Sequence, residues 1–265
     1  MELVKAIENM AEMIAEIMHG CIDSIWLYGS AAMDDFHLGW SDIDLLALTS
    51  KQITDEQGRE LLLLRQCMAD QEPDNPYCLS FEGIIADKTE YLSGAFSKLV
   101  YWGTTGQRIT GSYQQDTFSA YELAKFGKSV YGGTDRNFFP IPSREDMVAA
   151  VRRHNDAIRQ YAVQTNEKLY SCGWLLDIAR CIYTLRYNDI LSKTQAGVWA
   201  LSEHIFENED PMLRTLEIRK DPLKYKHRED VKRWLAGLGP TVQQYADVLE
   251  QELEKQSSAR TAKEE

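Results

Sequence analysis

Residues 24–48 of the chain, SIWLYGSAAMDDFHLGWSDIDLLAL, decide the fold. A short apolar run ends at Gly29-Ser30, a polar stretch follows, and a second apolar run begins at Asp42. Short runs of apolar side chains bounded by turn residues are typical of buried strands. The segment therefore predicts two buried strands, with a glycine–serine turn after the first and two aspartates at the start of the second.

The two aspartates, Asp42 and Asp44, are separated by one residue, so on a strand both carboxylates point to the same face. Acids placed in this way repel each other unless a cation lies between them, and Mg²⁺ prefers oxygen ligands that it shares with substrate phosphates. A third expected strand, residues 79–86, carries the single acid Glu82. If that strand lies beside the second, Asp42, Asp44 and Glu82 form a site for two Mg²⁺ ions, which can clamp the attacking and leaving oxygens of a phosphoryl transfer.

Gly29 and Ser30 predict a phosphate-binding turn. Glycine lets the backbone approach a ligand closely, and backbone N–H groups together with a serine hydroxyl can hold phosphate oxygens. We place Ser41, next to Asp42, among the same nucleotide-binding residues. The simpler interpretation of Ser30, an ordinary turn residue, is weaker because the aspartate pair follows at a fitting distance.

The rest of the chain predicts an α+β protein with a small mixed-sheet domain at residues 1–139 and an all-α helical bundle at 140–256. Two prolines mark the linker at residues 138–142, and Ser143 with Asp146 forms an N-cap signature just after it. The polar residues 257–265 predict a disordered tail. Helical patterns cover the expected segments 1–19, 54–70, 118–130, 144–165, 167–187, 193–206 and 228–255.

The composition excludes several classes of function. The chain has 29 basic and 41 acidic side chains, a net charge of -12, which argues against nucleic acid as a partner and suits a cationic substrate. No apolar run approaches the ~18 residues of a membrane span. Five cysteines without paired spacing, and an N-terminal helix rich in acids, favour a cytoplasmic protein. The sequence does not indicate the oligomeric state.

The compound motif resembles the signature of the polymerase-β-like nucleotidyltransferase superfamily. Its parts are Leu27-Tyr28-Gly29-Ser30, a spacer of eleven residues, and Asp42-Ile43-Asp44-Leu45. Phe81-Glu82-Gly83, the stretch from Trp174 to Arg180, and Ile190 to Leu201 are similar to the aminoglycoside adenylyltransferases that modify streptomycin and spectinomycin. The resemblance touches both expected domains.

This resemblance implies an enzyme that binds ATP and Mg²⁺ between a polymerase-β-like domain and a helical domain. Asp42 and Asp44 would then bind the metals, and Glu82 would be the base that takes the proton from the attacking hydroxyl. Arg180 and Lys193 match the family's arginine and lysine that contact the nucleotide phosphates. A bridge from Arg180 to Asp177 is the alternative for the arginine.

Two departures from the family fall on the acceptor side. The start of the helix before Arg180 is Tyr170-Ser171-Cys172-Gly173, without the family's acids, and Tyr101-Trp102-Gly103 stands where the family has Gly-Glu-Trp. We expect the substrate to contact Tyr101, Trp102 and Asp177.

The leading hypothesis is transfer of AMP from ATP to a hydroxyl of an aminoglycoside-like antibiotic, with release of pyrophosphate and resistance as the result. A lincosamide, a metabolite or a protein hydroxyl is the alternative acceptor. A non-catalytic nucleotide-binding module is the third hypothesis, which the presence of all three carboxylates disfavours.

Overall fold

The computed structural model describes residues 2–103, 106–133 and 135–264, with side chains to residue 256. The chain divides into two compact units. The first comprises residues 1–36 and 41–141, and the second comprises residues 37–40 and 142–265. Each has its own helices and its own buried apolar side chains.

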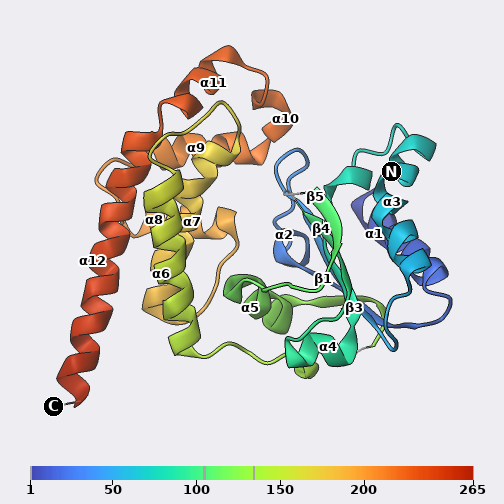
Figure 1. The fold of residues 1–265 in the computed structure, drawn as a ribbon. Helices are drawn as coiled ribbons and strands as arrows, with labels where there is room; N and C mark the ends of the chain where they lie inside the picture. Colours follow the sequence, from blue (N-terminus) through green and yellow to red (C-terminus); the bar gives the residue numbers. More distant parts are fainter. Residues whose placement is uncertain (1, 104–105, 134, 265) are drawn as a thin grey trace. The chain divides into compact units, whose positions relative to one another are not determined.

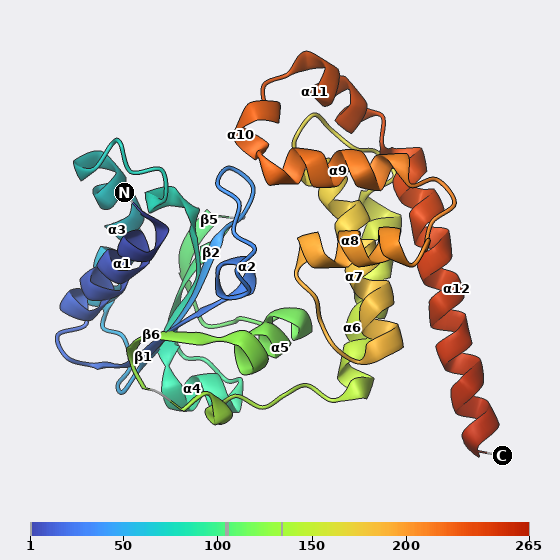
Figure 2. The same ribbon diagram turned by 180° about the vertical axis from the view of Figure 1, so that it is seen from behind.

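The first unit is built on one mixed sheet of six strands in the order β5-β4-β3-β2-β1-β6 (Figures 1 and 2). β2 and β3 are parallel, and the other neighbours are antiparallel. The strands are β1 (Ile22–Tyr28), β2 (Ile43–Thr49), β3 (Phe81–Asp87), β4 (Leu99–Gly103), β5 (Gly106–Thr110) and β6 (Lys128–Gly132). The helices are α1 (Leu3–Ile17), α2 (Gly29–Ala32), α3 (Asp55–Gln71), α4 (Lys88–Ser93) and α5 (Thr117–Phe126), with 3₁₀ turns at Cys78–Ser80 and Arg136–Phe138.

Each face of the sheet has its own apolar cluster. Helices α1 and α3 cover one face, where alternate residues of β2 such as Ile43 and Leu45 are buried (Figures 1 and 2). The other alternating set, including Leu46 and Leu48, packs on the opposite face against Leu123 of α5. Both faces of β2 are therefore buried beyond its first residues, which explains its continuous apolar run.

The predicted strands near residues 24–28, 43–48 and 79–86 are confirmed, and so is the α+β class. The helix expected over residues 118–130 was wrong at its end, because α5 stops at Phe126 and Lys128–Gly132 pairs with β1 as edge strand β6. Neither β4 nor β5 was predicted from the sequence. β5, Gly106–Thr110, is an exposed edge strand with little apolar pattern to reveal it.

The second unit is helical. Its helices are α6 (Arg144–Tyr161), α7 (Tyr170–Tyr187), α8 (Lys193–Ser202), α9 (Asp210–Lys220), α10 (Pro222–Tyr225), α11 (Glu229–Ala236) and α12 (Gly239–Glu264). The predicted N-cap at Ser143 is confirmed as a capping box, with Asp146 N donating to Ser143 Oγ at 3.2 Å. The single helix expected over 228–255 is two helices interrupted at Gly237. Residues 257–264, expected as a disordered tail, continue α12, since this stretch contains neither glycine nor proline to end a helix.

A short piece of the motif spacer, residues 37–40, belongs to the helical unit. The Trp40 ring lies under the Arg219 guanidinium at 5.3 Å, and Arg219 Nε donates to Thr194 Oγ1 at 2.9 Å. His37 Nε2 lies 3.4 Å from the same hydroxyl. Within residues 2–103, 106–133 and 135–264, no helix combines the length and the apolar character needed to span a membrane.

Candidate active site

The strand register brings together the motif residues of β1, β2 and β3. Asp44 lies opposite Glu82 in the parallel pair and opposite Tyr28 in the antiparallel pair. Direct partners on neighbouring strands share a face, and Asp44 shares its face with Leu46 and Leu48. The same face therefore carries the two carboxylates at the strand starts and an apolar cluster farther along.

The Gly29-Ser30 turn lies directly against these carboxylates. Gly29 has a φ of +64°, and a Cβ built on it would lie 2.1 Å from Asp44 Oδ2, so no other residue fits without moving Asp44. Ser30 Oγ donates to the backbone carbonyl of Asp42 at 3.4 Å. The half-buried Ser41 precedes Asp42 in the chain. The structure thus brings together Gly29, Ser30, Asp42, Asp44 and Glu82, as the motif spacing predicts.

Electrostatics single out Glu82 among the acids. Burial and the neighbouring Asp42 carboxylate raise the pKa of Glu82 to about 7, while Arg65 acts in the opposite direction. A carboxyl with a pKa near neutrality can take up and release a proton at physiological pH. Glu82 is therefore suited to act as a general base, and the like-charged Asp42 is one cause of its raised pKa.

Arg65 on α3 is a residue of this site that the sequence analysis missed. Its Nη1 donates to the backbone carbonyl of Phe81, the residue before Glu82. Its Nε and Nη2 both donate to Gln107 Oε1, at 3.2 and 2.8 Å. Burial lowers the pKa of Arg65, whereas Glu82 and Asp42 act to raise it. Arg65 thus fixes the start of β3 and supplies a positive charge near the carboxylates, but nothing in its helix pattern marks it.

Two tyrosines, Tyr28 and Tyr113, lie near the Asp44 carboxylate. Burial and the adjacent Asp44 carboxylate raise the pKa of Tyr28 well above its usual value. Burial and Tyr101 raise the pKa of Tyr113 to about 12, while a side-chain hydrogen bond with Tyr28 acts to lower it. Both phenols therefore stay neutral at physiological pH. Tyr28 was part of the quoted motif, yet only the fold shows its contact with Tyr113.

The residues present fit a divalent cation in chemical type. Asp42, Asp44 and Glu82 are oxygen donors of the kind that Mg²⁺ prefers, and the raised pKa of Glu82 reflects its burial and the negative charge of Asp42 close by. In the part of the chain that the structure describes, no three His, Cys, Asp or Glu side chains already form a closed metal cluster. A cation would therefore have to draw the three carboxylates together.

In the helical unit, the predicted nucleotide-binding residues lie around Asp177. Lys193, the first residue of α8, forms an ion pair with Asp177 of α7 at 3.0 Å. Burial opposes ionisation, but Lys193 and Arg180 hold the pKa of Asp177 below its usual value. The structure thus brings Asp177, Arg180 and Lys193 together. The positive charges of Arg180 and Lys193 therefore already interact with the Asp177 carboxylate.

Of the two aromatic residues placed against the substrate, only one lies on the carboxylate face. Successive side chains of β4 alternate between faces, so Tyr101 packs beside the apolar cluster next to the carboxylates and Trp102 does not. Trp102 is 1% exposed and donates its indole N–H to the Leu61 carbonyl at 3.0 Å. The prediction that Trp102 contacts substrate was wrong, because its side chain is part of the core beneath α3.

Comparison with known proteins finds one matching family model and similar solved structures. Residues 137–233 match the family model for the aminoglycoside adenylyltransferase C-terminal domain. The chain is similar to the crystal structure of spectinomycin adenyltransferase AAD(9) from Enterococcus faecialis with ATP and spectinomycin. The TM-score is 0.60 and the identity 17%, over 93% of this chain and 98% of that one.

A second similarity is to the tri-AMPylated Shewanella oneidensis HEPN toxin in complex with MNT antitoxin, at 16% identity over 60% of this chain and 93% of that one. Its TM-score of 0.25 is too low to support a conclusion about the fold. A comparison with curated proteins gives no match. The chain therefore shares the fold of AAD(9), and residues 137–233 of its helical unit match the C-terminal domain of the aminoglycoside adenylyltransferases.

Proposed function

We propose that the chain transfers AMP from ATP to a hydroxyl of an aminoglycoside-like antibiotic and releases pyrophosphate. The observation that carries this proposal is the register of β1, β2 and β3, which sets the Gly29-Ser30 turn and the acids Asp44 and Glu82 side by side. A phosphate-binding turn beside acids of this kind is what in-line nucleotidyl transfer needs.

Glu82 is the proposed base. Its pKa of about 7 lets it accept the proton of the acceptor hydroxyl as that oxygen attacks the α-phosphorus. Asp42 and Asp44 would hold Mg²⁺, with one Glu82 oxygen completing the set. The bound ions would neutralise the charge that builds up on the phosphoryl oxygens.

The turn and two cations of the helical unit complete the proposed nucleotide site. Backbone N–H groups at Gly29 and the Ser30 hydroxyl would contact the leaving pyrophosphate, with Ser41 next to them in the loop. Lys193 and Arg180 would exchange part of their contact with Asp177 for the nucleotide phosphates. Phosphoryl transfer depends mainly on positioning and charge stabilisation, which these groups supply.

The acceptor is proposed to be a cationic molecule with free hydroxyls. A net charge of -12 favours the approach of a polycation, and Asp177 offers a carboxylate to an ammonium group. Tyr101 offers an aromatic face on the side of the sheet that carries the acids. The start of α7, residues 170–173, contains no acid, so a lincosamide, a metabolite or a protein hydroxyl remains the alternative acceptor.

Pyrophosphate release from ATP and Mg²⁺ with a panel of aminoglycosides and lincosamides tests the proposal. We expect release with one compound and a mass gain of one AMP on it. Glu82→Gln should lower turnover at least ~100-fold, the usual contribution of a positioned base, while the ATP affinity measured by calorimetry changes little. Release at the wild-type rate by Glu82→Gln would refute the assignment of the base. ATP binding without release across the panel would move the acceptor to a metabolite or protein, and absence of ATP binding would favour the non-catalytic module.

A further inference from the structure

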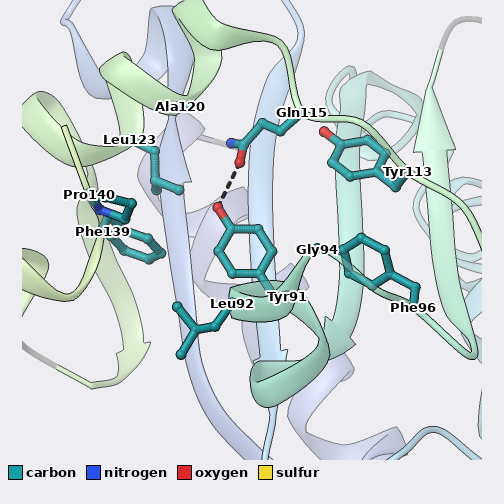
Figure 3. A pocket seen from close by; sticks show the side chains of 10 residues that line it. All are labelled: Tyr91, Leu92, Gly94, Phe96, Tyr113, Gln115, Ala120, Leu123, Phe139 and Pro140. Atoms are coloured by element: carbon teal, nitrogen blue, oxygen red, sulfur yellow. Dashed lines mark hydrogen bonds between the residues drawn. The ribbon is translucent and has the colours of Figure 1, made fainter. Parts of the chain in front are cut away.

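The first unit contains an aromatic cavity that the proposed reaction does not use (Figure 3). The cavity has a volume of about 230 Å³ and is lined by residues of α4, of the loop between α4 and β4, of α5, and of the segments that precede and follow α5. Its aromatic lining residues are Tyr91, Phe96, Tyr113 and Phe139. Small-molecule sites are typically concave and lined by apolar and aromatic side chains, so a pocket with four aromatic rings in its wall points to an occupant.

The volume limits the size of that occupant. A cavity of about 150 Å³ lined by apolar side chains is known to hold benzene. A volume of about 230 Å³ is therefore enough to hold one ring or two fused rings.

The lining is uncharged, and its hydroxyls already have partners. None of the ten lining residues is an acid or a base. The Tyr91 hydroxyl donates to Gln115 Oε1 at 2.6 Å, as the dashed line in Figure 3 shows. Tyr113 hydrogen-bonds with Tyr28, and burial raises the pKa of Tyr91 so that the phenol stays neutral. A cationic or polyhydroxylated ring would lose its water here without enough replacement hydrogen bonds.

The ring geometry suits a flat guest. Tyr91 and Phe139 meet edge to face with centroids 6.2 Å apart, and Phe96 and Tyr113 meet in the same manner at 6.4 Å. Edge-to-face pairs leave ring faces and edges available to a further aromatic ring, which gains contact energy beyond the area that it buries.

We propose that this cavity binds a small, uncharged aromatic molecule of one or two fused rings, with a polar atom directed at the Gln115 amide. This ligand is distinct in chemistry from both ATP and a cationic acceptor, so the proposal goes beyond the proposed reaction. The wall residue Tyr113 bonds to Tyr28, which precedes Gly29 and lies opposite Asp44. The occupant therefore contacts a side chain that supports the carboxylate face.

Titration of the full chain with indole, in the absence of nucleotide, tests the proposal by calorimetry. We expect saturable binding with one site per chain, and at least ~10-fold weaker binding of indole-3-acetate, whose charge the lining cannot compensate. Ala120→Leu, which fills the cavity from α5, should weaken indole binding at least ~10-fold. Ser119→Leu, on the same helix but outside the lining, is the matched control and should bind indole like the wild type.

A second cavity-filling variant tests the proposal in case Ala120→Leu does not fold. Leu92 lines the cavity but is 54% exposed, so Leu92→Trp should fold normally and weaken indole binding as well. No binding of indole to the wild type, equal binding of indole-3-acetate, or unchanged affinity in both filled variants would each overturn the proposal. Because the readout is binding without turnover, its failure is distinguishable from failure of the proposed transferase activity.

Discussion

At the scale of single residues, Glu82 makes stability depend on pH. Its pKa is about 7 in the folded protein against 4.5 for a free glutamate, so the folded state holds the proton more tightly. The free energy of unfolding should therefore fall as pH rises from about 4.5 to about 7, by roughly 1–2 kcal/mol through this group, because solvent screens part of the effect at this half-buried carboxyl. Glu82→Gln should remove this decrease and be more stable than the wild type at pH 8.

Urea unfolding at pH 5 and pH 8, in the presence of a chelator, measures this difference. Glu60→Gln, at an exposed position on α3, is the matched control and should show the pH dependence of the wild type. If the stability gained by Glu82→Gln is the same at both pH values, burial does not raise the pKa of this carboxyl in the folded protein.

Replacement of Gly29 should lower both stability and turnover. Gly29→Ala should cost about 1–2 kcal/mol from its left-handed backbone alone. It should lower turnover by much more than this loss of stability implies, because the new Cβ displaces the Asp44 carboxylate. Gly20→Ala separates the two effects, since Gly20 has a φ of +76° and open space around the Cβ position. Thermal unfolding and pyrophosphate release report the two quantities, and equal activity in both variants would argue against a role for Asp44.

At the scale of elements, the capping box of α8 positions Lys193. Ser192 Oγ accepts from Gln195 N, and Gln195 Oε1 accepts from Ser192 N, so the helix begins at Lys193. Ser192→Ala should destabilise the helical unit by about 1 kcal/mol and raise the KM for ATP, and Ser192→Thr should restore both. Ser202→Ala, at the other end of α8, is the control. An unchanged KM for ATP in Ser192→Ala would argue that Lys193 does not contact the nucleotide.

Among the elements, β1, β2, β3 and α6 carry a strong local signal and were predicted, whereas β4 was missed although residues 99–102 form an apolar run. β1, β2 and β3 are continuous apolar runs because both their faces are buried, and α6 carries a capping box at its start. β5 and β6 are edge strands whose residues are mostly exposed, so their sequences lack the pattern of a buried strand. α5 was extended too far because Lys128–Gly132 forms a strand only through its pairing with β1.

At the scale of the whole molecule, four residues of the motif spacer belong to the helical unit. Trp40 packs under Arg219 at 5.3 Å, and a Cβ on Gly173 of α7 would lie 3.6 Å from the Trp40 ring. Trp40→Ala should therefore destabilise the helical unit by about 1–2 kcal/mol, from a lost cation–π contact and lost apolar burial. Hydrogen exchange should show reduced protection of α7 and α9 amides and unchanged protection of β1. Trp40→Phe should keep most of the protection, and a loss confined to β1 would contradict this assignment.

The sequence by itself determined the acids, the sheet face that they share and the Gly29-Ser30 turn, because a strand places alternate side chains on one face wherever it lies. Only the tertiary structure decided which other residues meet them. Arg65 reaches the start of β3 from α3, and Tyr113 reaches Tyr28 from a loop, through contacts between residues far apart in the chain. The same pairing of β4 with β3 places Tyr101 on the carboxylate face and turns Trp102 into the core. Register between distant strands is set by the packing of the whole sheet, and no local pattern of residues records it.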